Sequence, residues 1–122
     1  ACDLPIWVKL PLAHAAALAP VAVEAGAVGL VVGQAPVGAA LRTVDGQHRP
    51  VRGALYGPLA FPPMLAALLA VAALGLPAAL IASGGIHTGE QVRQALAAGL
   101  AAVQIDSAVW VEPGLPGRLV RG

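Results

Sequence analysis

The sequence predicts an α/β protein with a parallel sheet, and three observations point to that class. Short apolar runs typical of buried strands alternate with longer Ala- and Leu-rich runs typical of helices. Each crossover between successive strands is long enough to hold a helix, as parallel strands require. Hydrophobic residues make up 58% and charged residues 11% of the chain, against about 25% charged residues in an average protein. We therefore expect one domain with a large buried fraction and no intrinsic disorder.

The first part of the chain has the order strand, helix, strand. Ile6-Trp7-Val8-Lys9-Leu10 is rich in β-forming residues and predicts a strand. Residues 14–25 are rich in alanine and predict a helix that is interrupted near Pro20 and ended by Gly26. Residues 28–32 predict a second buried strand.

Residues 33–58 predict a long loop, because this segment holds eight glycines and prolines and breaks the apolar pattern. Loops of this length are uncommon inside compact domains and tend to be functional. We expect a lid or a ligand-facing segment. Its polar side chains include Arg42, Asp45, His48, Arg49 and Arg52.

The second half of the chain adds two helix–strand pairs. Thr88 followed by Gln91 has the spacing of a capping box, which predicts that a helix begins there, and Gly99 is placed to end it. The expected elements are a helix over 61–74, a strand over 78–83, a helix over 88–98 and a strand over 101–105.

This element order leaves two architectures open, both with right-handed crossovers. The first is an open doubly wound sheet, which the chain length favours. The second is four consecutive units of a (β/α)8 barrel, a fold that normally needs about 250 residues. The local motifs described below favour the barrel.

The composition argues against nucleic-acid and membrane partners. Seven Lys and Arg against six Asp and Glu give a net charge of +1, and few aromatic side chains are available to stack on bases. The apolar run over 65–81 is interrupted by Gly75-Leu76-Pro77, so each part is shorter than the span of a bilayer.

Cysteine and histidine usage predicts no structural metal and no disulfide. Cys2 is the one cysteine of the chain, and His14, His48 and His87 share no ligand spacing. The start of the sequence has no basic region of the signal-peptide type. These features favour a cytoplasmic protein.

Two neighbouring strand ends predict a phosphate site. Ile81-Ala82-Ser83-Gly84-Gly85-Ile86-His87-Thr88 is a buried strand that runs into two glycines and a capped helix. Glycines at such a turn let backbone N–H groups approach an anion, and the helix dipole favours negative charge, although an ordinary tight turn looks the same. The next unit, Val103-Gln104-Ile105-Asp106-Ser107-Ala108, ends with a hydroxyl residue. In barrels, the loops after the last two strands jointly bind phosphate.

Lys9 lies in an apolar strand near its end, where an ammonium group needs a partner. Two interpretations are open: Lys9 contacts a cofactor carbonyl or developing negative charge, or it pairs with Asp3 or Asp106. Gln104 has two interpretations as well, a donor to a ligand or a hydrogen-bonded amide in the core.

The ordered set of motifs resembles the C-terminal half of the dihydroorotate dehydrogenases. The resemblance covers essentially the whole chain, and it implies strands five to eight of an FMN-binding (β/α)8 barrel, with residues 1–122 as the C-terminal half of that domain and the barrel incomplete in this chain. The motifs are Trp7-Val8-Lys9-Leu10-Pro11, Gly53-Ala54-Leu55-Tyr56-Gly57-Pro58, Ser83-Gly84-Gly85-Ile86 with Thr88-Gly89-Glu90, Ala98-Gly99, and Val103-Gln104-Ile105-Asp106-Ser107-Ala108.

The resemblance also implies a set of FMN-binding residues. In the family, a lysine lies against the pyrimidine edge of the flavin, glycines line the cofactor, and the ends of the last two strands hold its phosphate. The matching residues are Lys9 at the flavin edge, Gly53 and Gly57 along the cofactor, and Gly84, Gly85, Asp106 and Ser107 at the phosphate.

Three departures from the family pattern concern the substrate and the cofactor. Gly33 and Gln34 stand where the family has an Asn, which binds orotate, followed by Ser or Thr. Gly53-Ala54 replaces a Gly-Gly pair and narrows the room beside the flavin. Asp106-Ser107 replaces Gly-Thr and brings a carboxylate near a phosphate, which is repulsive unless the side chain turns away or meets a cation. The family's Cys or Ser base belongs to the other half, so the sequence names no catalytic base.

The resemblance implies a flavin-dependent enzyme of pyrimidine biosynthesis that oxidises a dihydropyrimidine-like substrate. Two alternatives stay open: a phosphate-binding barrel fragment that acts on a sugar-phosphate or nucleotide without flavin, and a non-catalytic assembly module. A half-barrel leaves two sheet edges open, so we expect it to need an N-terminal half-barrel or to self-associate.

Overall fold

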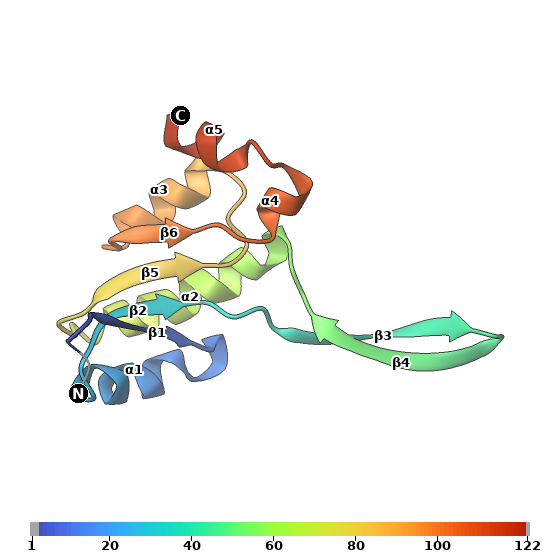
Figure 1. Cartoon of the computed structure of the whole chain (residues 1–122), viewed down its shortest axis with the longest axis horizontal. Coiled ribbons are helices and arrows are strands. Elements are labelled where there is room, and N and C mark those ends of the chain that lie inside the picture. The colour runs from blue at the N-terminus through green and yellow to red at the C-terminus, as the bar shows by residue number, and fades with distance from the viewer. Residues whose placement is uncertain (1–2, 122) are drawn as a thin grey trace.

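The computed structural model describes residues 3–121, and its main unit is an open parallel sheet. Its four strands lie side by side in the order in which they occur in the chain (Figure 1). A doubly wound sheet reverses its strand order at a switch point, whereas barrel strands follow one another without reversal. The sheet is therefore an incomplete TIM-barrel fragment rather than a doubly wound sheet. The strands are β1 (Ile6–Leu10), β2 (Ala27–Val32), β5 (Ala79–Ser83) and β6 (Ala102–Gln104).

Helices fill the crossovers between these strands, and three of them contribute to one hydrophobic core. Leu30 and Val32 of β2 and Ala82 of β5 share one face of the sheet and are fully buried with Met64 and Leu68. The helices are α1 (Ala15–Glu24), α2 (Phe61–Ala72), α3 (Gly89–Ala97), α4 (Ala108–Val111) and α5 (Leu115–Arg121), with short 3₁₀ turns η1 (Leu12–His14) and η2 (Pro58–Ala60).

The opposite face of the sheet carries the side chains that alternate with the core residues. Trp7 lies across from Gly29 in the β1–β2 pair, and its ring occupies the space that a Cβ at Gly29 would take. Lys9 follows two residues later on the same face. This face corresponds to the interior of a barrel, and Trp7 remains 47% exposed there.

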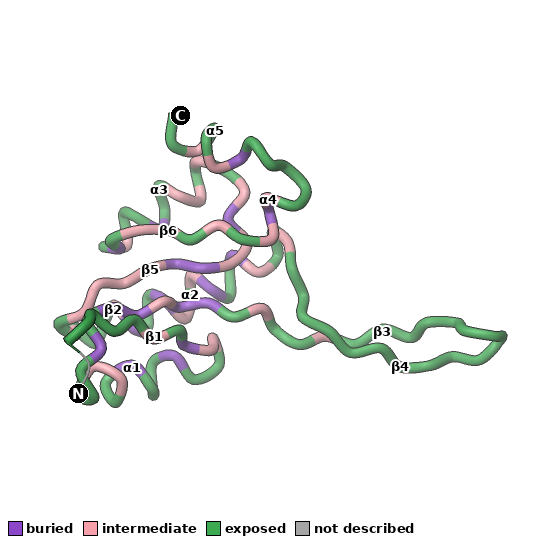
Figure 2. The backbone as a smooth tube through the Cα atoms, viewed as in Figure 1, coloured by how far each residue is buried: buried purple, intermediate pink, exposed green. Residues whose placement is uncertain are grey.

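The predicted loop over 33–58 is wrong, because most of it forms a β-hairpin. β3 (Val37–Val44) and β4 (Gln47–Ala54) pair antiparallel and project away from the sheet (Figure 1), and nearly all of their residues are exposed (Figure 2). Asp45 and Gly46 form the turn with φ of 51° and 74°. Asp-Gly is a preferred pair for the two-residue turn that matches the twist of a hairpin, so the sequence did contain this signal.

Smaller differences concern the helices. Pro20 does not interrupt α1; both Pro20 and Ala16 are exposed, so water can hydrogen-bond the Ala16 carbonyl that lacks a backbone donor. The capping box of Thr88 and Gln91 is confirmed, and the C-terminal helices α4 and α5 were not expected. In the part of the chain that the structure describes, no helix is long and apolar enough to cross a membrane.

Among residues 3–121, the two outer strands β1 and β6 are each paired on one side only. An apolar groove of about 350 Å³ lies between β1 and α1. It is lined by Ile6, Leu18 and Val21, whose exposed fractions range from 41% to 60%. Open edges and exposed apolar patches promote association. We expect isolated residues 1–122 to self-associate at micromolar concentration, as measured by light scattering.

Two variants test which surface is responsible for that association. Val21→Glu should weaken it by placing a charge in the groove beside β1. Leu74→Glu changes a residue that is 44% exposed outside the groove and should have little effect. A monodisperse wild-type monomer would contradict the expectation.

Candidate ligand site at the ends of the parallel strands

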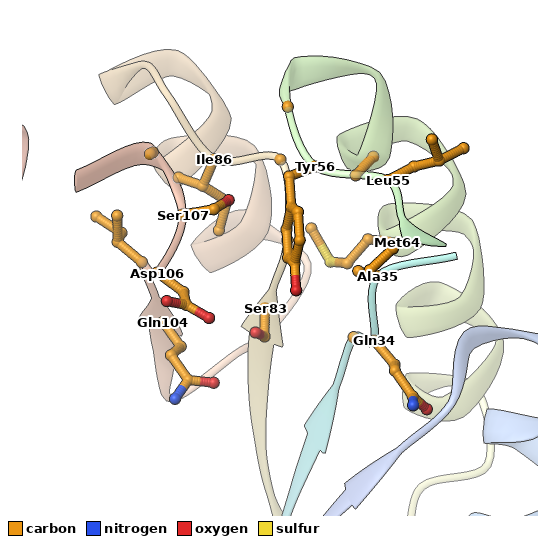
Figure 3. Close-up of a pocket in the computed structure, with 18 of the residues that line it drawn as sticks. Gln34, Ala35, Leu55, Tyr56, Met64, Ser83, Ile86, Gln104, Asp106 and Ser107 are labelled. Atoms are coloured by element: carbon orange, nitrogen blue, oxygen red, sulfur yellow. The ribbon is translucent and has the colours of Figure 1, made fainter. Parts of the chain in front are cut away.

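A cavity of about 310 Å³ lies where the parallel strands end. Its walls come from segments that follow β2, β4, β5 and β6 (Figure 3). Lys9 of β1 also lines it. This volume is at the lower end of the range for small-molecule sites, about 300–1,000 Å³. Parallel α/β proteins place their ligands at this end of the strands.

The structure brings the predicted site residues to this one cavity, with the exception of Gly53. Gly53 lies in β4 opposite Gly38 and is exposed, whereas its neighbour Ala54 lines the cavity. The predicted residues in the cavity wall are Lys9, Gly33, Gln34, Gly57, Gly84, Gly85, Asp106 and Ser107.

The turn after β5 has open space beside one of its glycines and unpaired backbone donors. Gly84 has a φ of 128°, and the space beside its Cα, where a Cβ would lie, is empty to 4 Å. Among residues 3–121, the backbone N–H groups of Gly84, Gly85 and Ser107 have no hydrogen-bond partner. Unpaired N–H groups around an open space are what a phosphate needs.

Gly85 and Gly33 have a different role from Gly84, because both are required for packing. A Cβ at Gly85 would overlap the backbone nitrogen of Phe61 at the start of α2. A Cβ at Gly33 would overlap the carbonyl oxygen of Ser83, and Gly33 has a φ of 146°. No other residue fits at either position without a backbone shift.

The N-terminus of α3 uses part of its backbone donors in its own capping box. The Gln91 side-chain oxygen accepts hydrogen bonds from the N–H groups of His87 at 2.8 Å and Thr88 at 3.1 Å. The Gln91 N–H donates to the Thr88 hydroxyl at 3.2 Å. The capping box thus pairs the N–H groups of His87, Thr88 and Gln91, whereas those of Gly89 and Glu90 have no hydrogen-bond partner among residues 3–121.

Lys9 pairs with a residue that the sequence analysis did not suggest. Its Nζ donates a hydrogen bond to Ser83 Oγ over 3.3 Å, so the predicted alternatives, a pair with Asp3 or with Asp106, are wrong. Lys9 is exposed, whereas Ser83 is buried, with 6% of its surface exposed. Lys9 lies on the face of the sheet that corresponds to the interior of a barrel, and this face is open to solvent. Its ammonium group is accessible to water there and needs no carboxylate partner.

Gln104 and Asp106 face the cavity from the end of β6. Gln104 is exposed, and its amide has no hydrogen-bond partner within residues 3–121, so it is not a hydrogen-bonded core amide. Figure 3 shows the Asp106 side chain extending toward Gln104, while Ser107 lies farther from the sheet. The carboxylate is therefore turned away from the Ser107 end of the cavity.

The ion pairs among residues 3–121 lie outside this cavity. Glu90 pairs with Arg93 at 2.9 Å and Glu112 with Arg118 at 2.8 Å. The hydrogen bond from Arg118 lowers the pKa of the Glu112 carboxyl. Both pairs are exposed and stabilise local helix geometry only weakly.

Sequence reasoning missed several residues of the cavity wall. Ser83 was noted only as part of a motif, although its hydroxyl is the partner of Lys9. Tyr56 and Met64 line the cavity from the chain after β4 and from α2. Assigning residues 33–58 to a loop hid the fact that a hairpin returns the chain to the cavity at Tyr56.

The fold and the cavity together define a class: a partial (β/α) barrel with a small-molecule site at the carboxyl ends of its strands. No family model and no curated protein matches the sequence. Solved structures do match it, and they make the fold more specific.

Two matching structures are dihydroorotate dehydrogenases from Eimeria tenella. The first, in complex with ferulenol, has a TM-score of 0.71 and 22% identity over 94% of this chain and 32% of that chain. The second, a ligand-free form, has a TM-score of 0.71 and 25% identity over 93% of this chain and 33% of that chain. The chain spans about a third of the length of these structures. It has the fold of a partial dihydroorotate dehydrogenase-like α/β fragment, so the resemblance inferred from its motifs is confirmed.

Proposed function

We propose that this chain is part of a flavin-dependent oxidoreductase of the dihydroorotate dehydrogenase type, with FMN bound in the cavity at the strand ends. The observation that carries the proposal is the turn at Gly84, which has unpaired N–H groups and empty space beside it and lines the same cavity as Ser107. The match to dihydroorotate dehydrogenase structures supports the same cofactor.

The residues present fit FMN at its phosphate end. The N–H groups of Gly84 and Gly85 and the hydroxyl of Ser107 would donate hydrogen bonds to phosphate oxygens. Asp106 extends away from that end of the cavity, which reduces its repulsion of a phosphate. FMN, when bound, supplies the hydride and electron chemistry, and the chain supplies position and charge.

Lys9 is placed to influence the redox group. Its ammonium group lies on the inner face of the sheet, within 3.3 Å of Ser83 Oγ at the cavity wall. A cation there stabilises negative charge that develops when a flavin is reduced.

Replacing Lys9 by methionine should therefore slow flavin reduction by roughly 10- to 100-fold while changing FMN affinity much less. Methionine keeps most of the apolar stem and removes the charge. Stopped-flow reduction and an FMN titration separate the two effects. Normal reduction with a lowered melting temperature would show that Lys9 is only structural.

The substrate in this proposal is a dihydropyrimidine-like molecule, and Gln34 is the side chain offered to it. Gly33 has no side chain, whereas Gln34 is exposed and lines the cavity. We expect weak orotate binding, because a site that lacks a needed hydrogen-bond donor loses affinity. We assign no catalytic base to residues 1–122, and we propose that further barrel strands complete the site.

A visible spectrum of the protein, as purified and after incubation with FMN, tests the proposal. The two visible bands of oxidised flavin, retained after gel filtration, support it. A phosphate-binding fragment without flavin, or an assembly module, would stay colourless after reconstitution, and that result would reject the flavoenzyme.

A further inference from the structure

Tyr56 is the aromatic side chain in the cavity wall, and nothing above assigns it a role. It follows β4, and its ring points into the cavity between the end of β6 and the residues Gln34, Ala35 and Met64 (Figure 3). Tyr56 is 59% exposed. A large part of its aromatic surface is thus accessible from the cavity.

The backbone on both sides of Tyr56 is fixed. Leu55 N–H donates to the Pro36 carbonyl at 2.8 Å, and Ala60 N–H donates to the Gly57 carbonyl at 3.0 Å. The position from which the ring enters the cavity is therefore set by the hairpin base and by the start of η2.

The ring itself has few partners. Its centroid lies 6.2 Å from that of Trp110, with the two planes tilted by 54°. Within residues 3–121 the Tyr56 hydroxyl makes no hydrogen bond. The backbone at Tyr56 is held in place, its ring has one tilted aromatic neighbour, and its hydroxyl is unpaired among residues 3–121. The Tyr56 ring is therefore suited to contact a planar ligand.

We propose that Tyr56 stacks on the planar heterocycle bound in this cavity and thereby helps to select it. This inference rests on the proposed function, in which that heterocycle is the flavin. Offset stacking of aromatic rings is favourable beyond the area that it buries, and the electron-rich phenol ring suits an electron-poor heterocycle.

Fluorescence of bound FMN tests the stacking. A phenol in contact with an excited flavin transfers an electron to it and takes the electron back, so the flavin emits weakly. We expect the full protein loaded with FMN to be strongly quenched. Tyr56→Leu should restore emission several-fold and weaken FMN binding by about tenfold.

Two further variants make the test specific. Tyr56→Phe keeps a stacking ring but donates electrons less readily, so affinity should be retained while emission rises. Leu59→Ala changes a neighbouring residue that is 90% exposed and lies outside the cavity wall, and it should alter neither property.

The outcomes separate the two proposals. If the wild-type protein binds FMN but Tyr56→Leu changes neither emission nor affinity, the stacking contact is wrong and the proposed function stands. If the wild-type protein binds no FMN, both proposals fail.

Discussion

Gly84→Asp should lower the affinity for FMN by about 100-fold or more. The space beside the Gly84 Cα is open and Gly84 lines the cavity, so the new carboxylate would lie close to the N–H groups that this account assigns to the phosphate. It would repel the phosphate and accept hydrogen bonds from the same N–H groups. The loss is therefore electrostatic and competitive rather than a general loss of folding.

Gly84→Ala is the matched control for backbone strain. At a φ of 128° any L-residue is strained, and both variants should lose about 1–3 kcal/mol of stability. Alanine adds no charge, so its FMN affinity should fall by less than about tenfold. Equal affinities of the Asp and Ala variants, measured by titration of the folded proteins, would contradict the phosphate assignment.

Gly33→Ala should cause the largest loss of stability of the substitutions considered, about 2–5 kcal/mol. The added Cβ would overlap the Ser83 carbonyl oxygen, which belongs to a buried strand and has little freedom to move. Backbone strain at a φ of 146° adds to the overlap. Urea unfolding measures the effect.

Gly26→Ala is the control for that experiment. Gly26 also has a positive φ, 101°, but its surroundings are empty to 4 Å, so it should lose only about 1–3 kcal/mol from strain. A loss at Gly33 no larger than that at Gly26 would show that the Ser83 carbonyl yields easily.

The tight packing at Gly33 also determines which variant can test substrate binding. An asparagine introduced at position 33 would disrupt the β2–β5 junction before it could bind anything. Gln34→Ala is the informative variant, because Gln34 is exposed and lines the cavity.

The strands of the parallel sheet could be predicted from sequence because buried parallel strands are nearly continuous apolar runs. β1 was predicted with its observed bounds, and the other strands differ by a residue or so at their ends. The sequence did not decide between an open doubly wound sheet and a barrel fragment. The pattern of apolar residues indicates which strands are buried, but it does not indicate which strands are neighbours in the sheet.

The hairpin was missed because its residues are exposed on both faces. The alternation of apolar and polar residues that identifies a strand arises from burial of one face, and β3 and β4 bury neither. The Asp45-Gly46 pair, which is typical of a two-residue hairpin turn, was the remaining sequence feature that indicates this hairpin.

The roles of the glycines could not be separated from sequence. Gly84 and Gly85 are adjacent glycines that the sequence cannot distinguish. In the structure Gly84 borders open space, whereas Gly85 packs against the start of α2. That distinction depends on Phe61 at the start of α2, which lies more than twenty residues earlier in the chain. The partner of Lys9 was hidden for the same reason, because Ser83 is 74 residues away in sequence.

The affinity of the protein for FMN compared with riboflavin tests the central claim most directly. The two ligands share the isoalloxazine ring and differ in the phosphate, so their ratio isolates the proposed phosphate site at Gly84 and Ser107. The account predicts that FMN binds about 100-fold more tightly than riboflavin and that Gly84→Asp removes most of this difference. Equal affinity for the two flavins, or no binding of either, would contradict it.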